Sequence, residues 1–131
     1  MDNLKAWGSY YISHRRVGPM DAVMFDIDDT LIFTNGKANV PMIELLREAK
    51  AMGYKIVIIT ARPGLTPVIH WTIKQLGNYG IGFDYIGFTS AATKSLMKQQ
   101  LPYKFILSVG DLPTDLTDSQ HFLNISSFYH N

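Results

Sequence analysis

Three aspartates lie within four consecutive positions, directly after a run of apolar residues. The run covers 22–25, and Asp26, Asp28 and Asp29 follow it, with Thr30 next. Carboxylates crowded in this way repel one another unless a cation or a proton lies between them. The cluster therefore predicts a metal site, a catalytic site, or both.

Polar residues also follow two later apolar runs. The run 56–59 ends at Thr60, and the run 105–109 precedes Asp111, with Asp115 in the next turn of chain. Together with the first cluster, these carboxylates would form an all-oxygen donor set. Hard oxygen ligands suit Mg²⁺, which commonly shares its coordination with a phosphate oxygen. We therefore expect Mg²⁺ as the cofactor.

Several cationic or hydroxyl side chains could bind the phosphate itself. Thr60 offers a hydroxyl, and Lys94 or Lys98 could reach the anion with an ammonium group. A carboxylate, a divalent cation and donors to an anion are what phosphoryl transfer requires. Of the two lysines, Lys98 is the better candidate for a solvated surface charge. Arg62 either lines the substrate entrance or is exposed to solvent.

The hydrophobic pattern predicts alternating strands and helices that would position these residues. The expected strands are 22–25, 55–59, 84–88, 105–109 and 122–125, and the expected helices are 41–52, 66–76 and 91–101. This alternation is typical of a parallel sheet covered by helices on both faces, a three-layer α/β/α Rossmann-like fold. Right-handed crossovers favour the strand order 5-4-1-2-3. Asp26, Thr60 and Asp111 would then meet at the carboxyl edge of the sheet.

Length and composition set the limits of the fold. The chain has 131 residues, 47% hydrophobic content, a net charge of +1 and no cysteine. We expect an N-terminal arm at 1–19, with a short helix, and a single core domain at 20–131. Near-zero charge indicates no membrane partner, and nucleic acid only as a substrate. With no apolar run suited to a signal peptide or a membrane span, we expect a cytoplasmic protein.

Four motifs in order resemble those of the haloacid dehalogenase-like (HAD) phosphohydrolases. They are the DxDx[TV] motif at 26–30, an apolar strand ending at Thr60, a lysine that begins a helix at Lys94, and GDxxxD at 110–115. The resemblance covers nearly the whole chain from Ala22 and extends to the acid-phosphatase and nucleotidase branches. It implies a phosphatase that hydrolyses phosphate monoesters through an aspartyl-phosphate.

The resemblance also implies a role for each motif residue. Asp26 would be the nucleophile, and Asp28 the general acid and base. The family also uses the backbone carbonyl of the residue matched by Asp28 as a metal ligand. Asp26, Asp28 and Asp111 would thus bind the metal, with Asp115 as a further ligand or a partner of one. Thr60 and Lys94 would hold the phosphoryl oxygens.

Some alternatives remain open at this stage. Asp29 is more readily interpreted as a turn residue than as a catalytic group. The segments 33–40 and 88–92 are too short for a large cap domain, so the site should be open to a small molecule, a nucleotide or the phosphorylated end of a macromolecule. The protein could instead be a non-catalytic binding or regulatory module with this fold, or a phosphotransferase that uses the same phosphoenzyme. The chain could also form an oligomer.

Overall fold

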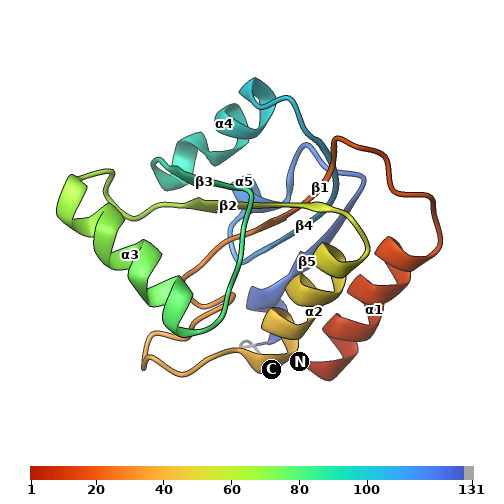
Figure 1. Cartoon of the computed structure of the whole chain (residues 1–131), viewed down its shortest axis with the longest axis horizontal. Helices are drawn as coiled ribbons and strands as arrows, with labels where there is room; N and C mark the ends of the chain where they lie inside the picture. Colours follow the sequence, from red (N-terminus) through yellow and green to blue (C-terminus); the bar gives the residue numbers. More distant parts are fainter. Residues whose placement is uncertain (129–131) are drawn as a thin grey trace.

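A five-stranded parallel sheet lies between two layers of helices in the computed structural model, which describes residues 1–128 (Figure 1). The strands are β1 (Asp21–Phe25), β2 (Lys55–Thr60), β3 (Tyr85–Phe88), β4 (Lys104–Gly110) and β5 (His121–Asn124). Their order is β3-β2-β1-β4-β5, and every neighbouring pair is parallel. The predicted fold class and strand order are therefore confirmed, and no large domain is inserted between these strands.

Helices cover both faces of the sheet. They are α1 (Asp2–Ser13), α2 (Val40–Ala51), α3 (Thr66–Asn78), α4 (Lys94–Gln100) and α5 (Pro113–Leu116), with short 3₁₀ turns at Ala91–Thr93 and Ile125–Phe128. The side chains of β1 alternate between two cores. Val23 and Phe25 pack with α1, α2 and Leu76 of α3, whereas Met24 lies in the other core, against Met97 of α4.

Local sequence signals explain most of the helix boundaries. Pro41 lies in the first turn of α2, where its missing N–H costs nothing, and Gly53 ends that helix with φ of 101°. Thr66 does not cap α3 as its hydroxyl would suggest. The N-cap is Leu65, and Thr66 is itself the first helical residue. The third predicted helix is also shorter than expected, because a 3₁₀ turn precedes Lys94, where α4 begins.

The N-terminal arm contributes a helix to the main hydrophobic core. Ile12 of α1 is fully buried in it, and its carbonyl accepts a hydrogen bond of 2.8 Å from the hydroxyl of Tyr54. Arg15 then pairs with Asp21 at 2.7 Å, which ties the arm to the start of β1. Across residues 1–128, no helix is both long enough and apolar enough to span a bilayer.

The three central strands end at one edge of the sheet. β1 ends at Phe25, β2 at Thr60 and β4 at Gly110, and β1 lies between the other two. In open parallel sheets, ligands bind beyond the carboxyl ends of the strands at the point where the strand order reverses. That point lies here between β1 and β4, next to Asp26.

Candidate active site

Asp26 is held in place by the sheet itself. Its amide donates a 3.0 Å hydrogen bond to the carbonyl of Val109, which continues the β1–β4 pairing one residue beyond the strand. The side chain is 7% exposed, so its carboxylate lies in a largely dry environment. A buried carboxylate requires partners for its oxygens.

A tight turn follows and reverses the chain after Asp28. The carbonyl of Ile27 accepts hydrogen bonds from the amides of Leu31 and Ile32. Asp29 lies in the left-handed region with φ of 62°, and its carboxylate accepts hydrogen bonds from the amide and hydroxyl of Thr34. Aspartate tolerates this conformation better than most residues do. The interpretation of Asp29 as a turn residue is confirmed.

Three of the predicted metal ligands come together. One carboxylate oxygen from each of Asp26, Asp111 and Asp115 lies within 4.8 Å of the others. Gly110 permits this approach, because a Cβ at that position would lie 2.5 Å from the Cβ of Asp115. The side chain of Asp115 is fully buried and accepts a hydrogen bond of 3.0 Å from the amide of Leu112.

Lys94 joins two of these carboxylates. Its ammonium lies 2.8 Å from Oδ1 of Asp26 and 2.9 Å from Oδ1 of Asp115, and its side chain is 1% exposed. Burial raises the pKa of Asp26 to about 8, and the charge of Asp115 adds to this rise while Lys94 opposes it. Burial would lower the pKa of Lys94, but the two carboxylates outweigh it and raise that pKa. One ammonium thus balances only one of two buried carboxylates.

The chemistry of this group fits a hard divalent cation. Its donors are carboxylate oxygens only, the ligand type that Mg²⁺ prefers. Two ligands on opposite sides of Mg²⁺ are about 4.2 Å apart, so small side-chain movements would bring all three into range. The carboxylate of Asp28 is not part of this group. Coordination through its backbone carbonyl stays a prediction.

The side chain of Asp28 is instead bound by Arg62. Nε of Arg62 donates to Oδ2 of Asp28 at 3.0 Å, and a terminal nitrogen donates to Oδ1 at 2.8 Å. Such a two-point pair fixes the plane of the carboxylate as well as its position. Asp28 is 56% exposed and Arg62 only 11% exposed, so the pair lies at the border between the site and solvent.

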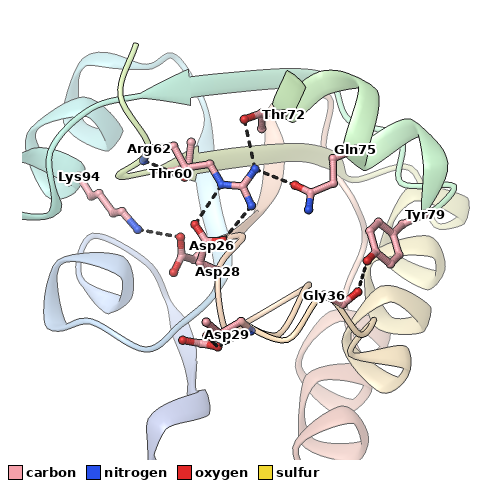
Figure 2. Close-up of polar contacts among 11 residues, drawn as sticks. Asp26, Asp28, Asp29, Gly36, Thr60, Arg62, Thr72, Gln75, Tyr79 and Lys94 are labelled. Carbon is pink, nitrogen blue, oxygen red and sulfur yellow. Dashed lines mark hydrogen bonds and ion pairs between the residues drawn. The ribbon is translucent and has the colours of Figure 1, made fainter. Parts of the chain in front are cut away.

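Residues of α3 bind the guanidinium of Arg62 through the terminal nitrogen that does not contact Asp28 (Figure 2). The other terminal nitrogen donates to Oγ1 of Thr72 at 3.1 Å and to Oε1 of Gln75 at 2.7 Å. The guanidinium also lies 5.1 Å from the centre of the Trp71 ring. The five N–H bonds of a guanidinium lie in one plane, so hydrogen bonds to these partners fix its orientation.

The two remaining predicted anion ligands have different surroundings. Thr60 is fully buried at the end of β2, and its hydroxyl oxygen accepts a 3.1 Å hydrogen bond from the amide of Arg62. Its role in binding phosphate stays a prediction. Lys98 is not a solvated helix charge, because it is 2% exposed. It donates to Ser108 and to the carbonyls of Asp115 and Thr117, and burial lowers its pKa to about 8.

Lys98 therefore binds the backbone of the segment that carries Asp115, whereas Lys94 faces the predicted nucleophile. The sequence left open whether Lys94 or Lys98 contacts phosphate. Of the two, Lys94 contacts the carboxylates of Asp26 and Asp115, and its contact with phosphate stays a prediction.

The support for Arg62 was missed by the sequence analysis. Thr72 and Gln75 are polar residues three positions apart on a helix that follows Arg62 within a few residues. Side chains at this spacing share one helical face, so a polar pair there could have indicated a partner for the arginine. No sequence pattern indicated that Trp71, the residue before Thr72, would contact Arg62.

Known proteins share both sequence and fold with this chain. Residues 23–113 match the family of haloacid dehalogenase-like hydrolases. A Bacillus subtilis (strain 168) protein named "Putative phosphatase YxeH" is 27% identical over 111 residues, which are 82% of this chain and 41% of that protein. The chain therefore spans less than half the length of this curated relative.

Solved structures show the same fold. The Class C acid phosphatase from Bacillus anthracis matches with a TM-score of 0.67 and 18% identity, over 89% of this chain and 65% of that chain. A chain of the Pnkp1/Rnl/Hen1 complex matches with a TM-score of 0.64 and 22% identity, over 75% of this chain and 41% of that chain. The sequence match to the hydrolase family spans more than half of the chain, and so this protein belongs to the haloacid dehalogenase-like hydrolase family.

Proposed function

We propose that the protein is a Mg²⁺-dependent phosphatase that hydrolyses phosphate monoesters through an aspartyl-phosphate on Asp26. The observation that supports this most directly is the convergence on Asp26 of two further carboxylates and one buried ammonium. A buried carboxylate beside a cation-binding group and a lysine is suited to attack phosphorus while the charge of the phosphoryl oxygens is neutralised.

The first step forms a bond between a carboxylate oxygen of Asp26 and phosphorus, and breaks the bond from phosphorus to the leaving oxygen. Protonated Asp28 donates its proton to that oxygen, so the leaving group departs as an alcohol. Both oxygens of Asp28 accept hydrogen bonds from Arg62 in the structure. One of these bonds must therefore open for the leaving oxygen to reach the carboxyl group.

In the second step, water attacks the phosphorus of the aspartyl-phosphate. Asp28 now takes a proton from the water, the bond from phosphorus to Asp26 breaks, and inorganic phosphate leaves. Asp26 and protonated Asp28 are thereby restored. Lys94 and the hydroxyl of Thr60 would hold phosphoryl oxygens in both steps.

Mg²⁺ bound by Asp26, Asp111 and Asp115 would supply positive charge to the phosphoryl oxygens. The same proposal places the backbone carbonyl of Asp28 among the ligands. Removal of the ion with EDTA should stop turnover, and added Mg²⁺ should restore it.

The deciding experiment replaces Asp26 with Asn and measures phosphate release from p-nitrophenyl phosphate. Loss of the nucleophile should lower kcat by roughly 10⁴-fold or more. Asp29→Asn is the matched control, because asparagine also tolerates the left-handed conformation at that position. We expect the control to keep its activity, and equal activity of wild type and Asp26→Asn would overturn the proposal.

A phosphotransferase would form the same phosphoenzyme and is distinguished by its products. In that case the phosphoryl group would pass to an added alcohol faster than to water. Only released phosphate, with no phosphorylated alcohol, is expected for the phosphatase.

A further inference from the structure

A pocket of about 370 Å³ lies along α3, beside the residues that hold Arg62. We call it the α3 pocket, and its lining residues are Trp71, Lys74, Gln75, Asn78 and Tyr79. The first four recur at helical spacing, so they share one face of the helix. The hydroxyl of Tyr79 donates to the carbonyl of Gly36, which brings the loop after β1 against the far end of this face (Figure 2).

Two residues of the α3 pocket contact Arg62, the partner of the predicted acid. Gln75 and Trp71 line the pocket and also contact the guanidinium of Arg62, which in turn binds Asp28. In the proposed reaction Asp28 protonates the leaving oxygen. Asp28 and Arg62 do not line the α3 pocket, so Arg62 is the link between the pocket and the proposed acid, and a leaving group bound at Asp28 would have to pass beside Arg62 to enter the pocket.

The lining has an aromatic face. Trp71 is 57% exposed even though its ring stacks over Arg62, so much of the indole remains open to a ligand. Base–aromatic stacking is the common way in which proteins hold unpaired nucleobases, and it tolerates any base. The amide groups of Gln75 and Asn78 stand at helical spacing beside this ring and can donate to the edge of a base.

The charge of the lining is positive. None of its five residues is acidic, and Lys74 forms no ion pair with any residue in the described part of the chain. An aromatic face beside an unpaired ammonium complements a base that carries a further phosphate. The volume lies in the lower part of the range of about 300–1,000 Å³ for small-molecule sites, which suits one nucleoside.

We propose that the α3 pocket is a leaving-group subsite that binds the nucleoside of a phosphorylated nucleotide, with its base stacked on Trp71. This inference rests on the proposed function, because it places the leaving group by the position of Asp28. The nucleotide has two sources, a free nucleotide or the phosphorylated end of a strand. Lys74 would contact the adjacent phosphodiester of a strand and would have no such partner in a nucleoside monophosphate.

A binding experiment can test the subsite without turnover. The chain has two tryptophans, so Trp7→Phe leaves Trp71 as the only indole. This change is combined with Asp26→Asn and titrated with adenosine 5′-monophosphate, adenosine 3′-monophosphate and glycerol 3-phosphate. We expect saturable quenching of the Trp71 fluorescence by at least one adenosine phosphate, and no quenching by glycerol 3-phosphate. If neither adenosine phosphate quenches the Trp71 fluorescence, or if glycerol 3-phosphate quenches it equally, the proposed subsite is wrong.

Kinetics then separate the subsite from the chemistry. Trp71→Leu should lower kcat/KM for the adenosine phosphate roughly 5- to 150-fold, mainly through KM, since stacking on one ring has about this effect. Because Trp71 also contacts Arg62, its replacement affects glycerol 3-phosphate as well, and kcat/KM for the adenosine phosphate should fall at least about fivefold more. Ile73→Ala is the matched control, because Ile73 is exposed on the same helix and does not line the pocket.

Other results have distinct meanings. Equal losses for both substrates would overturn the subsite but not the phosphatase. If wild type releases phosphate from no substrate, the proposed function fails, and the fluorescence titration alone decides whether the pocket binds nucleotides. If Trp71→Leu lowers kcat/KM for a phosphotyrosine peptide and not for the adenosine phosphate, the pocket binds a phosphopeptide and this inference is wrong.

The two nucleotide sources are separated with Lys74→Gln, compared with Lys50→Gln on the exposed surface of α2. A loss of kcat/KM for a terminally phosphorylated dinucleotide, but not for the mononucleotide, would identify the strand end. Unchanged values for both substrates, in a protein whose Trp71 variant shows the expected loss, would identify the free nucleotide.

Discussion

The ammonium of Lys94 lies 2.8 Å from Oδ1 of Asp26, although the two residues are 68 positions apart in the chain. Lys94 is the first residue of α4, and Asp26 directly follows β1. The same ammonium contacts Asp115 at 2.9 Å. One cation thus joins α4 to the end of β1 and to α5.

Replacement of Lys94 with Met should destabilise the metal-free protein by about 3 kcal/mol. The reason is that two buried carboxylates would lose their only ammonium partner in the described residues. Because Mg²⁺ can replace the lost charge, added Mg²⁺ should recover part of this stability. Urea unfolding in EDTA and in Mg²⁺ measures both effects. Lys50→Met should change the free energy of unfolding by less than about 0.5 kcal/mol, and equal stability of wild type and Lys94→Met in EDTA would contradict this account.

Gly110→Ala should weaken metal binding. Its new Cβ would lie 2.5 Å from both Cβ and Oδ2 of Asp115, so this carboxylate must move. We expect the Mg²⁺ concentration for half-maximal activity to rise about 10-fold or more. Gly77→Ala is the matched control, since nothing lies within 4 Å of its Cβ. That variant should keep its Mg²⁺ dependence and gain roughly 0.5–1 kcal/mol of stability, because alanine favours the helix.

Arg62→Lys should reduce turnover in a manner that depends on the leaving group. Lysine cannot replace the two-point contact that orients Asp28. General acid catalysis contributes about 10²–10⁴-fold, and an alkyl leaving group needs it most. We expect kcat/KM for glycerol 3-phosphate to fall much more than that for p-nitrophenyl phosphate, whose leaving group departs without a proton. Equal losses would indicate a different role for Arg62, and Arg16→Lys on the surface should affect neither substrate.

Asp21 should make stability depend on pH in the acid range. Burial alone would raise the pKa of Asp21, but hydrogen bonds from the amide of Gly18 and from Arg15 outweigh it and lower the pKa below 3.8. A lowered carboxyl pKa stabilises the folded state above the unfolded pKa. This contribution is lost as pH falls through the lower, folded value.

The comparison is urea unfolding of wild type and Asp21→Asn between pH 6 and pH 2. The difference in stability should be largest above about pH 4 and should shrink toward pH 2. A constant difference over this range would show that the Arg15–Asp21 pair does not couple to protonation.

The sequence predicted the sheet well because its determinants are local. Strands such as 105–109 are continuous apolar runs, and such runs are typical of strands buried on both faces. Strand order followed from crossover handedness, which excludes most other arrangements. The carboxylates at the ends of β1 and β4 were therefore expected at one edge, and Asp26, Asp111 and Asp115 are close together there.

Features that depend on contacts between distant segments were not predicted. Lys98 looked like a solvated charge because a helical lysine usually is one. It is buried because its ammonium lies over the ring of Phe105 and beside Ser108 of β4, where the carbonyls of Asp115 and Thr117 accept hydrogen bonds from it. One local signal was also misleading: Thr66 has the residue type of a helix cap, but α3 begins one residue earlier than such a cap requires.

The sequence by itself determined the strands, their order and the residues at the carboxyl edge, because apolar periodicity and crossover handedness are set by short stretches of chain. Only the tertiary structure decided that Lys94, not Lys98, faces Asp26, and that Arg62 binds Asp28 from a platform of Thr72, Gln75 and Trp71. The Arg62–Asp28 and Lys94–Asp26 pairs join residues 34 and 68 positions apart. Such distances in sequence leave no local pattern, so only the packing of helices on the sheet selects the partners.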